Sequence, residues 1–234
     1  MPTLLLRLAG PLQSWGSISK FDTRMTNSEP TKSGVIGMIA SAMGRSRSES
    51  VSDLISLRFG VRADQTGKML RDFHTAHSIS DAYVTNRYYL ADAVFLVGLE
   101  GERSTLKMIS DALRHPSHPL SLGRRSCTPV GRMVIGIFDG SLVETLKSAS
   151  WMASEWYKRK ESADVHLELT YDALEDEKGV LVKDVPISFS ESNRQYSMRN
   201  VIRETDGVIV TNEYARVKTD VSTDHDPFKT IRGD

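Results

Sequence analysis

The chain opens with a nearly continuous apolar run over residues 4–9, interrupted only by Arg7. The run stops at Gly10-Pro11 and is followed by a polar loop that carries Gln13 and Trp15. A short apolar run that ends at a Gly-Pro turn predicts a buried strand that delivers its loop to a sheet edge. Because an indole is costly to leave in water, Trp15 is expected to stack on or pack against a partner.

A second apolar pattern predicts a helix that begins near Thr31. Positions 35, 36, 39, 42 and 43 are apolar and recur at helical spacing. Thr31 and Ser33 are both suitable N-caps, and Gly44 provides the stop. The pattern therefore bounds this helix at both ends.

The first turns of this helix are unusual for a purely structural one. Gly34 and Gly37 each cost about 1 kcal/mol of helix propensity relative to alanine, and Lys32 lies at the positive end of the helix dipole. A phosphate bound at the free backbone amides would explain both features, with Lys32 as the counter-charge. Close packing of the helix against a sheet would also explain the glycines, and spacing does not decide between the two.

The remaining patterns predict a strand–helix–strand unit on either side of an excursion. The expected strands span residues 57–62, 93–99, 133–138, 165–171, 179–185, 196–203 and 208–210. The expected helices span residues 51–57, 104–114 and 142–147, the last with an extension toward 156. This order predicts an α+β fold with a ferredoxin-like or RRM-like sandwich, in which the helices cover one face of the sheet.

The domain organisation follows from the same order. Residues 1–138 are expected to form the RRM-like domain, from which residues 70–92 project as a β-hairpin, the thumb. A smaller β-rich part over residues 139–218 follows, in which 179–185 is expected to pair with 165–171. Residues 219–234 are polar with little to bury, so we expect a loosely held tail.

Composition narrows the class of protein without identifying it. A chain of 234 residues with 39% hydrophobic and 26% charged residues suits one large domain, or one domain with a small appendage. No apolar run is long enough to span a bilayer, and the N-terminus lacks the layout of a secretory signal. Cys127 is the single cysteine, and no zinc-ligand spacing is present. We therefore expect a cytoplasmic protein without a metal or other cofactor.

Charge is divided unevenly between the two halves of the chain, although the net charge is zero. Residues 1–135 hold 17 Lys and Arg against 11 Asp and Glu, whereas residues 136–234 hold 13 against 19. Such asymmetry predicts that the first half faces an anion. A chance fluctuation on a solvated surface is the alternative.

Three clusters combine residue types that bind nucleic acid. The first joins the loop at 10–16 to Arg24 and to Lys32-Ser33-Gly34. The second is Gly123-Arg124-Arg125-Ser126, where freed amides and two guanidinium groups would clamp a phosphate. The third interleaves Tyr83, Arg87, Tyr88 and Tyr89 on the thumb, which suits stacking between unpaired bases. A solvated arginine pair and ordinary hairpin packing are the alternatives for the second and third.

Catalytic residues are less clearly indicated. Metal-independent RNA cleavage needs a base, an acid and a cation, which His74 or His77, Tyr88 or Tyr89, and Lys68 could supply. A histidine in a strand is more often a structural or contact residue. The sequence contains no HExxH, GxSxG, Walker or GxGxxG pattern, so the corresponding enzyme classes are not supported.

Five segments taken in order resemble one family. They are LLLRLAGPLQSWGS, PTKSGVIGMIASAMG, LRDFHTAH, RYYLADAVFLV and LSLGRRSC. Over about residues 3–138 the chain resembles the CRISPR-associated RAMP superfamily, in particular the CasD-type subunits of type I-E Cascade complexes. The resemblance implies a RAMP domain with a thumb, a smaller C-terminal part and a non-catalytic role in antiviral defence. The segment between His77 and Tyr88 is shorter than the longest thumbs of the family, which limits its expected reach.

The resemblance also implies partners and a binding site. CasD-type subunits cap the 5′ handle of the crRNA beside the large subunit and the first backbone subunit, and meet target DNA only through the complex. Carried onto this sequence, the resemblance implies RNA contacts at Gln13, Trp15, Arg24, Lys32, Ser33, Gly34, Arg87, Gly123, Arg124, Arg125 and Ser126. Within the opening loop we expect Gln13 to contact RNA and Trp15 to brace the loop.

Two other functions stay open at this point. Related branches of the superfamily cleave repeat RNA, so a metal-independent endoribonuclease is the alternative. A stand-alone domain that binds single-stranded RNA is the third hypothesis.

Overall fold

A computed structural model of the chain describes residues 1–16, 23–77 and 82–215. The helices are α1 (Lys32–Ala42), α2 (Ser52–Ile55), α3 (Arg103–Arg114), α4 (Leu142–Ser148) and α5 (Glu155–Lys158). The strands of the larger sheet are β1 (Thr3–Ala9), β4 (Arg58–Gln65), β7 (Val94–Glu100), β8 (Val134–Phe138), β9 (Asp164–Asp172), β10 (Val180–Ser188) and β11 (Gln195–Thr211). The strands of the smaller sheet are β2 (Leu12–Gln13), β3 (Thr23–Arg24), β5 (Lys68–His77) and β6 (Ala82–Ala91).

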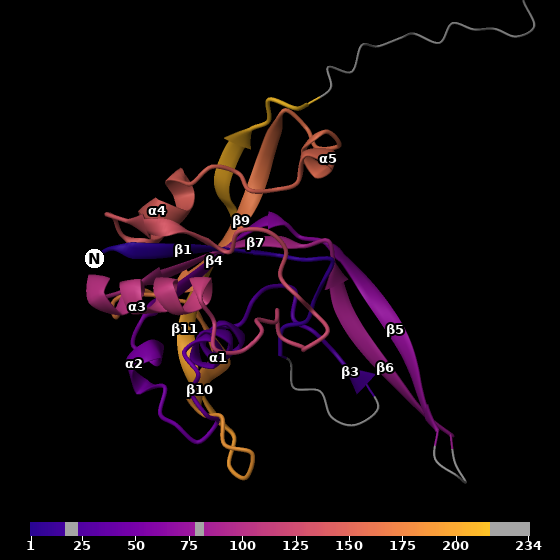
Figure 1. The fold of residues 1–234 in the computed structure, drawn as a ribbon. Coiled ribbons are helices and arrows are strands. Elements are labelled where there is room, and N and C mark those ends of the chain that lie inside the picture. The colour runs from indigo at the N-terminus through magenta and orange to yellow at the C-terminus, as the bar shows by residue number, and fades with distance from the viewer. Residues whose placement is uncertain (17–22, 78–81, 216–234) are drawn as a thin grey trace, which may run out of the picture.

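A ferredoxin-like core occupies the centre of the larger sheet. Its seven strands follow the order β10-β11-β9-β4-β7-β1-β8, and each neighbouring pair is antiparallel. Within it, β1, β4, β7 and β8 reproduce the β-α-β-β-α-β pattern, with α1 between β1 and β4 and α3 between β7 and β8 (Figure 1). The predicted α+β ferredoxin-like class is therefore confirmed.

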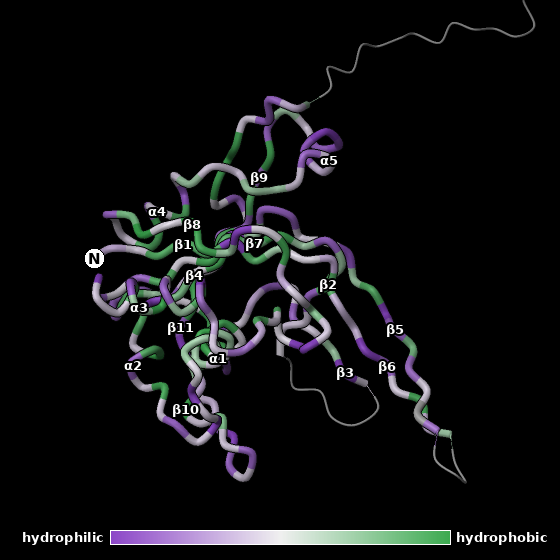
Figure 2. The backbone as a smooth tube through the Cα atoms, viewed as in Figure 1, coloured by the Kyte–Doolittle hydropathy of each residue, from purple (hydrophilic) through white to green (hydrophobic). Residues whose placement is uncertain are grey.

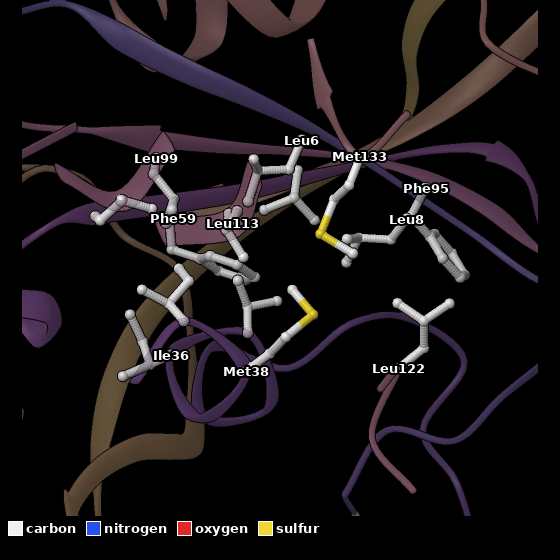
Figure 3. Packing of buried hydrophobic residues seen from close by; sticks show 14 of the residues in the cluster. Leu6, Leu8, Ile36, Met38, Phe59, Phe95, Leu99, Leu113, Leu122 and Met133 are labelled. Atoms are coloured by element: carbon white, nitrogen blue, oxygen red, sulfur yellow. The ribbon is translucent and has the colours of Figure 1, made fainter. Parts of the chain in front are cut away.

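Strand β1 is buried on both faces of this sheet, which explains its unbroken apolar sequence. Leu4, Leu6 and Leu8 belong to the main core with α1 and α3, whereas Leu5 belongs to a second core under α4. Figure 3 shows the main core, where Leu6 and Leu8 lie near Met133 and Phe95. The hydropathy colouring of Figure 2 shows the same contrast between the apolar central strands and the mixed thumb strands.

The C-terminal strands extend the same sheet instead of forming a separate layer. Strand β9 pairs with β4, so the predicted boundary after residue 138 is no break in the sheet. The predicted pairing of 179–185 with 165–171 is wrong, because β10 pairs with β11, which lies between β10 and β9. Strand β11 is one strand with an irregularity between Glu204 and Val208, where two short strands were expected.

Two further expectations concern the end of the chain. The helix at 142 does not extend toward 156, because α4 ends at Ser148 and α5 begins separately at Glu155. The expected loose tail at 219–234 lies outside the described residues. In the part of the chain that the structure describes, no helix is long and apolar enough to cross a membrane.

The thumb is a two-stranded hairpin that projects from the core (Figure 1). Strands β5 and β6 pair from Lys68↔Ala91 to His77↔Ala82, ten residue pairs in all. At about 3.3 Å per residue, the paired part is about 30 Å long. At its base β6 pairs with β2 and with β3, so the thumb is joined to the loop that follows β1.

A buried ion pair fixes β4 to the segment after α4. Arg62 and Asp64 are both inaccessible to solvent, and Arg62 Nε donates to Asp64 Oδ1 at 2.7 Å. The remaining donors of Arg62 reach the carbonyl oxygens of Leu146, Ala149 and Ser150 and the second oxygen of Asp64. The guanidinium thereby donates hydrogen bonds to carbonyl oxygens at and just after the C-terminal end of α4, which lack partners within the helix.

The second core contains a tyrosine that should make stability depend on alkaline pH. Burial and the hydrogen bond that its hydroxyl donates to Glu204 raise the pKa of Tyr171 to about 12. The folded state therefore favours the neutral phenol, whose contribution is complete below the unfolded pKa of about 10 and is lost as the pH rises toward about 12.

We expect the free energy of unfolding, measured by urea denaturation, to fall over this interval by less in Tyr171→Phe than in the unaltered protein. Tyr83→Phe, which alters a half-exposed thumb residue, should retain the full decline. An equal decline in Tyr171→Phe would contradict the assignment.

Candidate nucleic-acid interface

The loop after β1 holds its two conspicuous side chains in the interior. Gln13 and Trp15 are both completely buried. Gln13 Nε2 donates to the carbonyl oxygens of Leu8 and Ala93, at 3.2 and 2.7 Å, and Gln13 Oε1 accepts from Trp15 Nε1 at 3.1 Å. Trp15 therefore braces the loop, as expected. The predicted RNA contacts of Gln13 and Trp15 are corrected, because neither side chain has surface to offer.

The N-terminus of α1 already holds an anion, and that anion comes from the protein. Thr31 is the N-cap and accepts from the amide of Gly34 at 3.2 Å. The amide of Lys32 donates to Asp184 Oδ2 of β10 at 2.9 Å. The carboxylate of Asp184 thus occupies the place that the sequence suggested for a phosphate.

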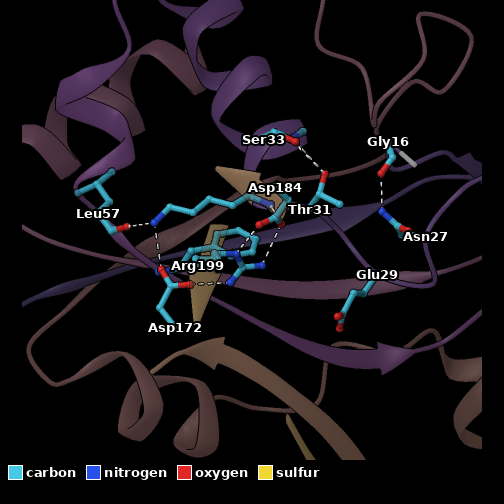
Figure 4. A network of polar contacts seen from close by, with 12 residues as sticks. Gly16, Asn27, Glu29, Thr31, Ser33, Leu57, Asp172, Asp184 and Arg199 are labelled. Atoms are coloured by element: carbon cyan, nitrogen blue, oxygen red, sulfur yellow. Dashed lines mark hydrogen bonds and ion pairs between the residues drawn. The ribbon is translucent and has the colours of Figure 1, made fainter. Parts of the chain in front are cut away.

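Lys32 belongs to the same internal network, in which Figure 4 labels Leu57, Asp172, Asp184 and Arg199. Its side chain is 6% exposed, and its ammonium group donates to Asp172 Oδ2 at 3.0 Å and to the carbonyl of Leu57 at 2.7 Å. The predicted RNA contact of Lys32 is therefore corrected as well.

Gly34 of α1 serves close packing. A Cβ added at Gly34 would lie 2.9 Å from the Trp15 ring, whereas one at Gly37 would make an ordinary contact with the Phe189 ring at 3.4 Å. Of the two explanations, the structure selects packing, and the amide of Gly34 is already paired with Thr31. Ser33 is half-buried beside them, with its hydroxyl 3.4 Å from Thr31 Oγ1.

No sequence pattern indicated the partners of Lys32. Asp172, Asp184 and Arg199 come from three strands of the C-terminal part, and Arg199 donates to both carboxylates. Burial opposes the charged form of Arg199, but its bonds to Asp184 and Asp172 outweigh burial and raise the pKa of this guanidinium. Two cations and two anions thus balance in a buried cluster that joins α1 to β9, β10 and β11.

The 122–127 loop packs against the loop after β1. Gly123 has φ +93°, and an added Cβ would lie only 1.6 Å from the carbonyl oxygen of Ser14, so no other residue fits there. Next to it, the amide of Ser14 donates to the carbonyl of Leu122 at 3.0 Å. Gly123 therefore positions this loop.

Arg124 fastens the same loop to the thumb. Its guanidinium donates to the carbonyl oxygens of Tyr88, at 3.2 Å, and Arg24, at 2.9 Å. It also lies over the ring of Tyr89, 4.7 Å from the centroid. Most of its donor capacity is used within the protein, so Arg124 is chiefly a positioning residue.

Cationic side chains gather around this junction. Arg24 of β3 and Arg87 of β6 are directly paired in the parallel register and therefore share one face of the smaller sheet. Tyr89, two residues along β6, lies on that face too, and Arg124 covers it. Arg125 and Ser126 are exposed on the adjoining loop. We call Arg24, Arg87, Arg124 and Arg125 the thumb-base cluster.

No member of the thumb-base cluster forms an ion pair with a described residue. Arg87 Nε is buried without a hydrogen-bond partner among the described residues. Asp72 is paired with Arg87 in the strand register, but its carboxylate lies 3.8 Å from His74 Nδ1. Unpaired guanidinium groups on a shared face can bind phosphate groups bidentately.

The residues considered for catalysis are not brought together. Lys68 begins β5 at the base of the thumb and His77 ends it at the tip, so about 30 Å separates them. His74 lies about 20 Å from Lys68 along the same strand. No group of histidine, cysteine or acidic residues suited to a metal ion occurs among the described residues.

Comparison with known proteins agrees with this architecture of a ferredoxin-like core and projecting thumb. A family model described as CRISPR-associated protein (Cas_Cas5) matches residues 3–202. The CRISPR system Cascade subunit CasD of Escherichia coli (strain K12) is 34% identical over 163 residues, which are 59% of this chain and 72% of that protein.

Two solved structures extend the match. A crystal structure of a Cas protein has a TM-score of 0.69 at 41% identity and covers 91% of this chain and 97% of its own. A chain of a CRISPR RNA-guided surveillance complex has a TM-score of 0.74 at 33% identity, with 91% and 92% covered. The fold is thus that of CRISPR-associated proteins of the RAMP type. The chain belongs to the Cas5 family, which confirms the resemblance of its motifs.

Proposed function

We propose that this chain is the CasD-type subunit of a type I-E Cascade complex, in which it binds the 5′ handle of the crRNA without catalysing a reaction. The names of its relatives, a Cascade subunit and a chain of an RNA-guided surveillance complex, support the assignment. Its partners are then the crRNA, the large subunit and the adjacent backbone subunit.

The observation that carries the RNA-binding role is the thumb-base cluster. Three segments that are distant in sequence, β3, β6 and the 122–127 loop, bring their arginines to one junction. Burying or crowding like charges is unfavourable without an anion, and the backbone of a single-stranded handle supplies one phosphate per nucleotide.

The proposed site therefore contains fewer RNA-contacting residues than the sequence predicted. Arg24, Arg87, Arg125 and Ser126 contact the handle, while Gly123 and Arg124 hold the loop in place. Exposed Phe73 and Tyr83 on the thumb offer rings on which unpaired bases stack.

Handle affinity tests the proposal. Replacing Arg87 and Arg125 together by alanine is expected to weaken binding of a labelled repeat-derived handle RNA about 10- to 100-fold, because two charge-assisted contacts are lost. The slope of log K against log salt should also become shallower by about 1.4. Fluorescence anisotropy over a salt series measures both quantities.

The control is Arg159→Ala, which removes an exposed arginine of the C-terminal part whose ion-pair partner among the described residues is Glu155. Undiminished handle affinity in the double variant would refute the site. The same RNA incubated with the protein in EDTA should stay intact, whereas cleavage that disappears in His74→Ala would identify an endoribonuclease instead.

A further inference from the structure

Strand β8 ends the larger sheet, and its outer edge carries no described strand. It pairs with β1 from Thr3↔Phe138 to Leu6↔Val134, and with no other strand of the described residues. Its sequence, Val-Ile-Gly-Ile-Phe, is entirely apolar, and Phe138 is 43% exposed. The backbone groups on its outer side form a template for a further strand.

The opposite edge of the same sheet is protected in a way that β8 is not. Strand β10 contains Lys183, Asp184 and Pro186, and its pairing is interrupted by two register shifts. Charges, proline and bulges are the devices by which proteins prevent strand addition at an edge. Strand β8 has one register shift and contains neither a charged residue nor a proline. At its beginning, the carbonyl of Val134 accepts from Arg132 Nε at 2.9 Å, so the edge available for pairing is the part after Val134.

A groove lies on each side of β8. On the α3 side, a groove of about 420 Å³ is lined by Leu113, Leu120 and Met133 and flanked by Arg114 and Arg132. On the α4 side, a groove of about 390 Å³ is lined by Leu5, Ile135 and Met152. Side chains of an added strand would alternate between these two grooves, since successive residues of a strand point to opposite faces.

The charges around the grooves indicate which charge a strand added to β8 should carry. On the α4 side, Asp139 pairs with Arg103, whereas Glu144 is bonded only within the capping box of α4 among the described residues and keeps its negative charge. On the α3 side, Arg114 and Arg132 are exposed and form no ion pair with a described residue. The uncompensated charge on the α3 side of this edge is therefore positive.

We infer that β8 is a docking edge for an extended segment of another protein subunit. The segment is apolar at alternate positions and carries an acidic residue opposite Arg114 and Arg132. It joins the sheet by backbone hydrogen bonds to β8 and fills the two grooves with its apolar side chains. This inference rests on the proposed function in one respect, namely that the partner is another subunit of the complex.

Hydrogen–deuterium exchange tests the inference on the free protein and on the complex assembled with crRNA and the other subunits. Those amides within residues 135–138 that face away from β1 should exchange at least about tenfold more slowly in the complex, because the added strand pairs with them. Amides of β10 provide an internal reference that should not change. Arg114→Glu should weaken incorporation of the subunit about tenfold or more, whereas Arg159→Glu should leave it unaltered.

Unchanged exchange at residues 135–138 in a complex that retains crRNA would overturn the inference and leave the proposed function intact. Slow exchange already present in the free protein would also overturn it, because the edge would then be covered by a second copy or by the chain itself. Failure of the unaltered protein to enter any complex would contradict the proposed function and the inference together.

Discussion

Replacing Lys32 by methionine is expected to lower the free energy of unfolding by about 3–5 kcal/mol. The ammonium group is one of two cations that balance Asp172 and Asp184 in a buried cluster. Methionine fills a similar volume but leaves one buried negative charge uncompensated and the carbonyl of Leu57 without its donor. Such a loss is a large fraction of the stability of an ordinary domain.

Chemical denaturation at neutral pH measures the effect. Arg47→Met is the matched control, since Arg47 forms an exposed ion pair with Glu191 and its loss should cost less than about 1 kcal/mol. Under conditions in which Lys32→Met remains folded, its affinity for handle RNA should equal that of the unaltered protein. A variant with normal stability and weakened RNA binding would show that Lys32 contacts RNA after all.

Replacing Gly123 by alanine is expected to destabilise the protein by about 2–4 kcal/mol and to weaken handle binding at the same time. The added Cβ would lie 1.6 Å from the carbonyl oxygen of Ser14, and alanine disfavours φ +93°. Because the carbonyl of Ser14 belongs to the backbone and cannot rotate away as a side chain would, the 122–127 loop has to move. Arg124 then loses its contacts to Arg24, Tyr88 and Tyr89, and the thumb-base cluster separates.

Gly16→Ala is the control for this variant. Apart from its chain neighbours, no atom of the described residues lies within 4 Å of a Cβ built at Gly16, so its effect should be within about 0.5 kcal/mol. Denaturation and handle binding are measured on both variants. Normal handle affinity in Gly123→Ala would mean that Arg125 binds RNA independently of the position of its loop.

The opening strand and its loop show how much of the structure can be predicted from the sequence. The apolar run at 4–9 and its Gly-Pro stop correctly indicated a buried strand, because burial on both faces leaves no polar alternation. The same reasoning indicated that Trp15 needs a partner but could not identify it. Trp15 donates to Gln13 and packs against α1 at Gly34. Gln13, which was predicted to contact RNA, is therefore an internal brace of the loop.

The first turn of α1 shows the same limit more sharply. Thr31 as N-cap and the need for an anion beside the free amides both follow from local geometry, and both are present. The identity of the anion does not follow, because Asp184 lies 152 residues away in the chain. A phosphate and a carboxylate satisfy the same electrostatic requirement, so no local pattern distinguishes them.

The sequence by itself determined the α+β class, the limits of α1, the projecting thumb and, through its motifs, the family. These properties depend on hydrophobic periodicity, turn residues and short motifs, each of which can be recognised within one stretch of the chain. Only the tertiary structure decided that β10 pairs with β11, that Lys32 is neutralised internally, and that Arg24, Arg87 and Arg124 meet at the base of the thumb. Each of these depends on contacts between segments far apart in the chain, and burial there determines which charges remain free for RNA.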